Sequence, residues 1–328
     1  MEETTIENAT NRVPARSAES LKVAVLRGGI GREREVSLES GRCVAEALRT
    51  AGLEVVSSDV GPDDLGILDN GDIDVFFLAL HGEFGEDGQL QQILEDRGLV
   101  YTGCGPETSR LAYDKIASKR RFAAAGVNVP ADVVVGDERA LAGLENRLRP
   151  LGERFVVKPV RQGSSVGVYI VEGPRQAAEA ARNVQQEFGD VLIEVFVPGR
   201  ELTVGVLGRD ALPIIEIRSR TGFYDYHAKY VSEQTEYLFD TVEDERVRDE
   251  IGRAAMACFD SLGCRDFARV DFILGGDGAI YALEVNTIPG FTTHSLLPKA
   301  AARTGLSMSE LCVGIVRTAS GRRSRRRH

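Results

Sequence analysis

The 328-residue sequence has no long hydrophobic run and no excess of positive charge. A helix that spans a membrane needs about 20 consecutive apolar residues, and no segment approaches that length. Lys and Arg number 40 against 50 Asp and Glu, which gives a formal net charge of −10. Affinity for phosphate backbones comes mainly from clustered Lys and Arg, so the sequence predicts neither a membrane span nor a nucleic-acid partner.

Cysteine patterns, export signals and the common nucleotide-binding motifs are also missing. The five cysteines are odd in number, scattered and never spaced as C-x-x-C, so we expect neither a disulfide framework nor a zinc site, and a cytoplasmic location. Residues 1–20 are polar and lack the apolar block of a secretory signal, and we expect a disordered arm there. Neither G-x-x-x-x-G-K-S/T nor G-x-G-x-x-G occurs, so P-loop and Rossmann sites are not supported.

Strand and helix patterns alternate in the first part of the chain. Leu21–Leu26 and Asp74–Leu80 are apolar strands, Ser37–Ala51 is a helix between them, and Val100–Tyr101 resembles the end of a third strand. Apolar strands joined by helices predict a parallel sheet covered on both faces. We expect this first α/β domain to occupy residues 21–108.

Two further domains are expected, because single hydrophobic cores rarely grow beyond about 250–300 residues. The central one, 109–200, should hold a helical stretch, three strands and a second helix, which are Ser109–Ala125, Val133–Val135, Phe155–Val157, Val191–Phe196 and Pro174–Phe188. The last one, 201–317, is richer in strand pairs. The arginine run within 318–328 is predicted to be a solvated basic tail, with contact to anionic lipid or RNA as the weaker alternative.

A β-hairpin is the most informative local pattern. Phe267–Leu274 and Ala279–Asn286 flank the turn Gly275-Gly276-Asp277-Gly278. Strict alternation would place Leu283 and Val285 on the core face. The opposite face would then carry Arg269, Asp271, Glu284 and Asn286. Oxygen ligands of this kind suit Mg²⁺ together with substrate phosphates, whereas the alternative is a solvated face with cross-strand ion pairs.

Four loops could meet ligands. Gly163–Gly167 follows Lys158 and could hold phosphates with backbone N–H groups, although a plain hairpin turn would look the same. His81–Gly88 and Gly28–Glu33 follow apolar strands, at the sheet edge where α/β folds bind ligands, but each could be a simple turn. Thr221–Tyr230, with four aromatic residues, could be a lid or a surface loop.

Nine blocks of sequence, taken in order, resemble D-alanine–D-alanine ligases of the ATP-grasp superfamily. They are GGIGREREVSLESG (28–41), HGEFGEDGQLQ (81–91), YTGCG (101–105), DK (114–115), KPVRQGSSVGV (158–168), GRE (199–201), FYDYHAKY (223–230), ARVDF (268–272) and EVNTIPGFTTHSLLPK (284–299). The resemblance covers about residues 21–317.

The resemblance implies an α/β fold of three domains, with ATP held between two antiparallel sheets. ATP would phosphorylate the carboxylate of one D-alanine, and the amine of a second would attack that acyl phosphate. The products would be ADP, phosphate and D-alanyl-D-alanine for peptidoglycan precursors and the cell wall. It also implies a cytoplasmic homodimer that uses two Mg²⁺ ions, with Mn²⁺ as a substitute.

The resemblance also implies roles for single residues. ATP would be bound by Lys115, Lys158, Gly163, Ser164, Ser165, Glu194, Val197, Glu201 and Lys229, with Glu194 and Val197 at the adenine and Glu201 at the ribose. The metal ions would be bound by Asp271, Glu284 and Asn286. The first D-alanine would meet Glu33 and His81, and the second would meet Ser295 and Lys229. Arg269 and the N–H of Gly290 would stabilise the acyl phosphate and the tetrahedral intermediate, while Ser164 and Tyr230 would hydrogen-bond with Glu33.

Two positions depart from the family pattern. Gly31 stands where the family usually has Ser, and His227 stands where it usually has Glu. Tyr230 favours D-alanine as the acceptor. The alternatives are the same chemistry with D-serine or D-lactate, and a nucleotide-binding relative without ligase activity. The intact set of phosphate, metal and oxyanion residues argues against the second alternative.

Overall fold

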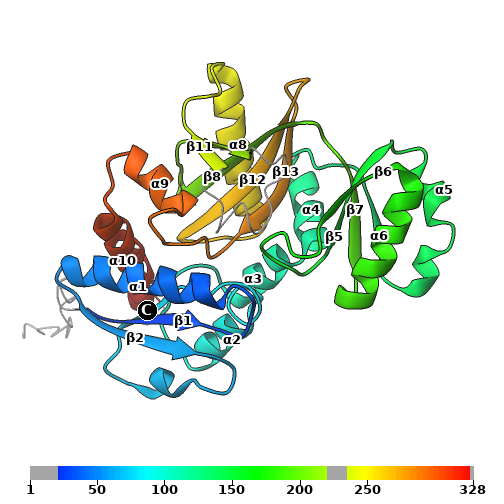
Figure 1. Cartoon of the computed structure of the whole chain (residues 1–328). Coiled ribbons are helices and arrows are strands. Elements are labelled where there is room, and N and C mark those ends of the chain that lie inside the picture. The colour runs from blue at the N-terminus through cyan, green and yellow to red at the C-terminus, as the bar shows by residue number, and fades with distance from the viewer. Residues whose placement is uncertain (1–20, 220–234, 326–328) are drawn as a thin grey trace, which may run out of the picture.

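The computed structural model describes residues 21–219 and 235–325, which form three β-sheets with helices packed around them (Figure 1). Two of the three sheets are antiparallel and the first is parallel. This arrangement confirms the predicted fold class, while the domain limits stay a prediction. The predicted lid, with His227, Lys229 and Tyr230, lies outside the described residues.

The first sheet is parallel, has the order β2-β1-β3 and lies at the bottom of Figure 1. Its unit contains β1 (Lys22–Gly28), α1 (Arg34–Thr50), β2 (Glu54–Val60), a 3-10 turn (Gly66–Asp69), β3 (Val75–Leu78) and α2 (Gln89–Asp96). The sequence did not predict β2, because this edge strand carries polar residues and only Val60 is buried. The predicted strand end at Val100–Tyr101 is reduced to a single parallel bridge, in which Tyr101 pairs with Phe76 of β3.

The second sheet is antiparallel, has the order β4-β7-β5-β6 and lies at the right of Figure 1. Its elements and the helices around it are α3 (Pro106–Tyr113), α4 (Lys115–Ala124), β4 (Asp132–Val135), a 3-10 turn (Glu138–Leu141), α5 (Leu144–Leu148), β5 (Arg154–Pro159), β6 (Tyr169–Glu172), α6 (Gly173–Phe188) and β7 (Val191–Val195). The predicted helix at 109–125 is two helices. They are separated at Asp114, whose side chain accepts hydrogen bonds from Ile116 N and Ala117 N and so begins α4.

The third sheet is antiparallel and runs in the order β11-β10-β8-β12-β13, with β9 paired to β8. Its unit contains β8 (Gly199–Leu207), β9 (Asp210–Ala211), β10 (Ile215–Ser219), β11 (Thr235–Leu238), α8 (Glu245–Ser261), β12 (Phe267–Gly275), β13 (Ile280–Asn286), α9 (Leu296–Arg303) and α10 (Met308–Arg325). The predicted hairpin is β12–β13. No described helix is long and apolar enough to cross a bilayer.

The predicted basic tail is in part a packed helix. α10 continues to Arg325, and the Arg322 guanidinium pairs with the buried Asp266 carboxylate. Arg322 Nη2 also donates to Tyr101 O at 2.5 Å. The prediction of a solvated tail was therefore wrong for Arg322, because the charge count of the run does not show which side chains face the protein.

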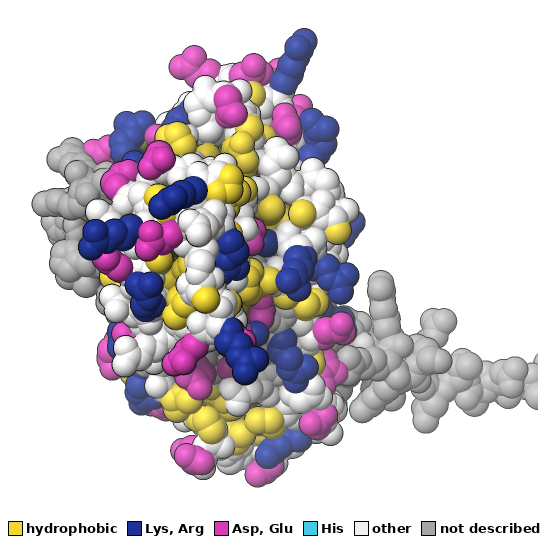
Figure 2. Space-filling model, turned by 90° about the vertical axis from the view of Figure 1, so that its right-hand side faces the viewer, with side chains coloured by type: hydrophobic (Ala, Val, Ile, Leu, Met, Phe, Trp, Pro, Cys, Tyr) yellow, Lys and Arg dark blue, Asp and Glu magenta, His cyan; other side chains and the backbone are white. Residues whose placement is uncertain are grey.

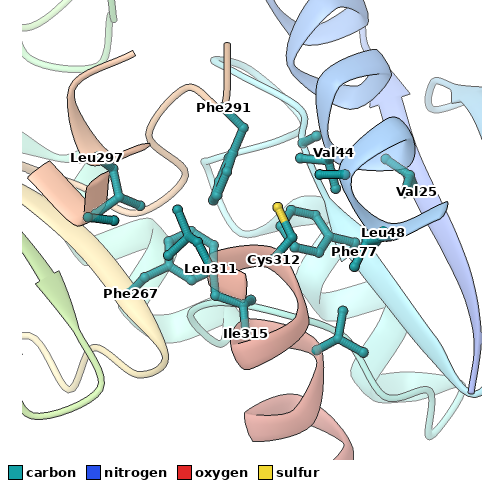
Figure 3. Close-up of a cluster of buried hydrophobic side chains, with 14 of the residues drawn as sticks. Val25, Val44, Leu48, Phe77, Phe267, Phe291, Leu297, Leu311, Cys312 and Ile315 are labelled. Carbon is teal, nitrogen blue, oxygen red and sulfur yellow. The ribbon is translucent and has the colours of Figure 1, made fainter. Parts of the chain in front are cut away.

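One apolar cluster joins the first sheet to the third (Figure 3). It gathers Val25 of β1, Phe77 of β3 and Phe267 of β12 around Phe291, which lies in the loop after β13. The rings of Phe77 and Phe267 each meet Phe291 edge to face, at centroid distances of 5.3 and 5.5 Å. The loop after β13 is thereby fixed between two sheets.

The outer face around α5 and α6 carries charged side chains of both signs. Lys and Arg side chains alternate there with Asp and Glu, and small apolar areas lie between them (Figure 2).

Candidate active site

Two adjoining cavities lie where the three sheets meet. The first, of about 450 Å³, lies between the second and third sheets. The second, of about 930 Å³, lies between the third sheet and the loops of the first. Both are lined by Lys115, Gln162, Gly163, Ser164 and Glu284. A group bound in one cavity can therefore meet a group bound in the other at this shared wall.

The first cavity gathers every predicted ATP-binding residue that the structure describes. Its lining includes Lys115, Lys158, Gly163, Ser164, Ser165, Glu194, Val197 and Glu201. The volume falls in the range of about 300–1,000 Å³ that is typical of small-molecule sites. The predicted ATP contact Lys229 lies outside the described residues.

Lys115 brings a positive charge to the shared wall. It begins α4 and is buried, and its Nζ donates to Gln162 O at 2.6 Å. Lys115 Nζ also lies 3.6 Å from Glu284 Oε2. The ammonium thus sits between the glycine loop and the hairpin, where a phosphate entering the first cavity would meet it.

Glu194 is a buried carboxylate held by two lysines. Lys158 Nζ lies 2.5 Å from Oε2, and Lys119 Nζ lies 2.6 Å from Oε1. Burial alone would raise the pKa of Glu194, but Lys158 and Lys119 together hold that pKa below its usual value. The sequence did not identify Lys119, since its partner Glu194 is far away along the chain.

In the second cavity, Glu33 joins the first sheet to the glycine loop. It precedes α1, and its Oε1 accepts the expected hydrogen bond from Ser164 Oγ. A Cβ at Gly82 or Gly163 would lie 2.7 or 2.8 Å from Glu33 Oε2. A side chain at either position would force the carboxylate to move from its place between the loops. The role of Glu33 as a substrate ligand stays a prediction.

His81 ties the loop after β3 to the loop after β13. Its Nε2 lies 3.2 Å from Ser40 Oγ, which also accepts a hydrogen bond of 3.2 Å from Phe291 N. Burial lowers the pKa of His81, which favours the neutral ring. Gly290 and Ser295, in the same loop after β13, line the second cavity with His81 and Arg269. The described residues predicted at the first and second substrates are therefore together.

Glu86 is a site residue that the sequence did not predict. Its carboxylate lines the second cavity beside Glu33, and its Oε2 accepts a hydrogen bond of 2.8 Å from Gly82 N. Burial, followed by the nearby charge of Glu33, raises the pKa of Glu86 to about 8. Its signal in the sequence was only an acidic residue within the glycine-rich segment after β3.

We expect Glu86 to make the folded state less stable as the pH rises. The folded protein keeps the Glu86 proton up to about pH 8, whereas the unfolded chain releases it near 4.5, so the folded state binds more protons between these values. Stability should therefore fall through this window, and Glu86→Gln should flatten the fall. Melting temperatures between pH 5 and 8 measure this. The exposed Glu83→Gln should keep the wild-type slope; parallel profiles for all three proteins would contradict the assignment.

The predicted metal ligands lie on neighbouring positions of the hairpin. Asp271 pairs with Glu284 in the β12–β13 register, and Asn286 pairs with Arg269. Asp271 Oδ1 accepts hydrogen bonds from Thr203 Oγ1 at 2.6 Å and Arg269 Nε at 2.9 Å. Among the described residues, no group of three or more His, Cys, Asp or Glu side chains could hold an ion. Two carboxylates and an amide fit Mg²⁺ if nucleotide phosphates complete its ligands.

One prediction about this hairpin was wrong. Leu283 does not lie on the core face but lines the first cavity with Glu284. The register shifts between Asp271 and Phe272, so that Phe272 pairs with Ala282 and Leu283 is left over as a bulge. A bulge interrupts the strict alternation from which the prediction was made, and it turns two consecutive side chains toward the first cavity.

Known sequence families match most of the chain. The family described as "D-ala D-ala ligase C-terminus" matches residues 123–317, and the one described as "D-ala D-ala ligase N-terminus" matches residues 64–104. The chain is 42% identical over 302 residues to the D-alanine–D-alanine ligase of Syntrophotalea carbinolica, covering 92% of this chain and 97% of the relative. It is 44% identical over 295 residues to that of Anaeromyxobacter sp. strain Fw109-5, covering 90% and 96%.

Solved structures show the same fold. The D-alanine–D-alanine ligase of Bacillus anthracis complexed with ATP is similar with a TM-score of 0.82 and 30% identity, covering 94% of this chain and all of that one. The D-Ala:D-Ser ligase VanG of Enterococcus faecalis is similar with a TM-score of 0.79 and 28% identity, covering 92% and 99%.

Proposed function

The chain belongs to the D-alanine–D-alanine ligase family, and we propose that it joins two D-alanine molecules to D-alanyl-D-alanine while ATP is converted to ADP and phosphate. The observation that carries this proposal is the wall shared by the two cavities. A terminal phosphate held in the first cavity and an amino-acid carboxylate held in the second would meet at Lys115 and Ser164. Transfer from ATP to the carboxylate needs this juxtaposition.

We place ATP in the first cavity because the residues that line it match the parts of ATP. Glu194 would accept the adenine amino group, Val197 would cover the ring and Glu201 would hold the ribose hydroxyls. Lys115 and Lys158 would bind phosphates, with the backbone of the glycine loop Gly163, Ser164 and Ser165 beside them. Lys229 stays part of the proposal from the family pattern alone.

The first D-alanine is placed in the second cavity. Its ammonium would pair with Glu33, next to His81, which leaves its carboxylate facing the shared wall. Arg269 and the Gly290 N–H would stabilise the negative charge that develops on the acyl phosphate and the tetrahedral intermediate. Ser295 would receive the carboxylate of the second D-alanine. Tyr230 and Ser164 would keep Glu33 in place.

We further propose that Asp271, Glu284 and Asn286 hold two Mg²⁺ ions together with the ATP phosphates, and that Mn²⁺ can replace them. Bound Mg²⁺ would neutralise charge on the phosphates during transfer. In the structure, Arg269 occupies both oxygens of Asp271, at 2.9 Å and 2.7 Å. Arg269 therefore also compensates the charge of the metal-binding carboxylate.

Asp271→Asn should weaken the binding of Mg²⁺ that the reaction needs. The substitution removes one anionic ligand, so the Mg²⁺ concentration for half-maximal rate should rise roughly tenfold, about 1.4 kcal/mol. A Mg²⁺ titration of ADP release at saturating ATP measures this. Asp277→Asn, at the exposed turn of the same hairpin, should leave the titration unchanged. An unchanged titration for Asp271→Asn would remove Asp271 from the metal site.

The acceptor is proposed to be D-alanine, because the similar proteins of Syntrophotalea carbinolica and Anaeromyxobacter are named D-alanine–D-alanine ligases. D-serine and D-lactate are the alternatives, since a D-Ala:D-Ser ligase has the same fold. Around Gly31, a Cβ would find only Glu33 N within 4 Å, at 3.9 Å. The usual Ser would fit there, and Gly31 is not part of the lining of the second cavity, so the change removes a hydroxyl without reshaping that cavity. Comparing kcat/KM across the three acceptors decides between them.

The proposed function is tested by ADP release with ATP, Mg²⁺ and D-alanine, with L-alanine as control and the product identified by mass spectrometry. ADP together with D-alanyl-D-alanine is the expected result. ADP release that depends on a different acceptor would keep the ligase and change its substrate. ATP binding without turnover for every acceptor would favour the non-catalytic relative.

The biological setting is proposed from the product. D-alanyl-D-alanine would serve peptidoglycan precursor synthesis and thereby the cell wall and cell shape, with the enzyme in the cytoplasm. A homodimer is also proposed, from the resemblance to the family. Light scattering coupled to size-exclusion chromatography would measure a mass near twice 35.6 kDa if the dimer forms.

A further inference from the structure

Lys119 is a buried cation next to the proposed nucleotide site. It lies on α4 with 3% of its surface exposed. Its Nζ meets three acceptors, which are Pro130 O at 2.8 Å, Glu194 Oε1 at 2.6 Å and Asp132 Oδ1 at 2.9 Å. The contacts to Pro130 and Glu194 are hydrogen bonds and the contact to Asp132 is an ion pair, and the three oxygens together fix the position of the ammonium.

Lys119 and Lys158 contact opposite oxygens of the same carboxylate. Lys119 meets Oε1 of Glu194, whereas Lys158 meets Oε2 at 2.5 Å. Lys158 and Glu194 line the first cavity, and Lys119 is not part of that lining as far as the described residues define it. One oxygen of Glu194 is thus bound from the protein interior, and the other is on the side from which a ligand enters.

The two lysines differ in what else they would have to bind. Lys158 would turn toward ATP phosphates in the proposed function and would share its donors with them. Lys119 is surrounded by three protein oxygens and, among the described residues, is not part of the lining of the first cavity, so it has no ligand to turn toward. When ATP is bound, Glu194 would therefore keep its contact with Lys119, whereas Lys158 would be shared with the phosphates.

We propose that Lys119 is a positioning residue for nucleotide selectivity, which keeps the Glu194 carboxylate ionised and oriented to accept the amino group at C6 of adenine. The inference rests on the proposed function, in which Glu194 meets the adenine edge. A purine with a carbonyl at C6, as in ITP or GTP, would bring an acceptor against this carboxylate. A buried acceptor that faces another acceptor loses its hydrogen bond and its solvation together.

A merely structural ion pair would behave differently. Removing one partner of a buried pair destabilises a protein whatever its ligand, because the remaining charge is left uncompensated. Such a loss of stability would lower activity with every nucleotide by a similar factor. The positioning role instead predicts a loss that depends on the group at C6 of the purine.

The experiment compares kcat/KM for ATP, ITP and purine riboside triphosphate, which has hydrogen at C6. The proteins are wild type, Lys119→Met, Lys119→Arg and the control Arg120→Met, since Arg120 is exposed on the same helix. Wild type and Arg120→Met should prefer ATP over ITP by at least about 100-fold. Lys119→Met should lose about 10–100-fold with ATP, mainly through KM, and little with the other two nucleotides. Lys119→Arg should recover part of the preference for ATP.

The outcomes separate the two proposals. ADP release with equal use of ATP and ITP by wild type would overturn the Glu194 assignment and the role of Lys119 with it, while leaving the ligase activity in place. A normal wild-type preference with the same ratio in Lys119→Met would overturn the role of Lys119 alone. If Lys119→Met does not fold, Asp132→Asn takes its place. This variant removes a charge from one Lys119 contact and should reduce the ATP-to-ITP ratio severalfold, and an unchanged ratio would overturn the role.

Discussion

Arg269→Ala is expected to lower kcat by about 10²–10³-fold while KM for ATP changes only a few fold. The guanidinium lines the second cavity and is held in place by two hydrogen bonds to Asp271, from Nε at 2.9 Å and from Nη2 at 2.7 Å. A cation fixed in this way can meet charge that develops only when the acyl phosphate and the tetrahedral intermediate form. Interactions made mainly in the transition state appear in kcat and not in nucleotide binding.

Steady-state kinetics with ATP and D-alanine varied separately measure this effect. Arg269→Lys should fall between wild type and Ala, since it keeps the charge but loses the planar pair of hydrogen bonds. Arg209→Ala removes an exposed arginine next to β8 of the same sheet, where it pairs with Asp260, and should be neutral. Equal losses in kcat and in ATP affinity would show that Arg269 already contributes to ATP binding in the ground state. Its proposed role in the transition state would then be removed.

Phe291→Ala is expected to lower the free energy of unfolding by about 3–5 kcal/mol and to lower kcat as well. Phe291 is fully buried, and its ring meets Phe77 and Phe267 edge to face at interplanar angles of 82° and 89°. These two rings come from different sheets. Deleting the ring between them opens a cavity and also releases Gly290, whose N–H is proposed to face the reacting centre.

Urea unfolding gives the stability change, and kcat at 25 °C with saturating substrates gives the catalytic change. Phe259→Ala is the matched control, since Phe259 is equally buried but packs in the cluster behind β12, around α8. It should lose similar stability and keep kcat, provided that the protein stays folded under the assay conditions. Equal kcat values for the two variants would show that Phe291 supports the fold without placing the loop.

The sequence predicted the residues that line the two cavities better than it predicted the packing around them. The alternation of polar and apolar residues put Arg269 and Asp271 on one face, and the structure places them against Asn286 and Glu284 in register. This worked because strand alternation is a local rule. It failed for Leu283, because a bulge depends on how two strands pair and cannot be inferred from one of them.

Residues that act through distant partners were the ones that sequence analysis missed. Lys119 meets Glu194 across 75 positions of the chain, and Glu86 owes its raised pKa to burial beside Glu33. Arg322, within a run of arginines, pairs with Asp266, which lies 56 positions away, just before β12. A local pattern has no information on such pairings, because they are set by tertiary packing. The family resemblance named contacts to substrate, but not the side chains that support those contacts.

β1 and α10 pack in one apolar cluster, and this affects how the protein can fold during synthesis. α10 packs against α1 and β3 and completes the core of the first unit (Figures 1 and 3). β1 begins at Lys22 and α10 only at Met308. At about 5–20 residues per second, a ribosome needs roughly 15–60 s to cover that distance, and the apolar surface of the first unit stays uncovered meanwhile. We therefore expect the nascent chain to expose this apolar surface until α10 has emerged.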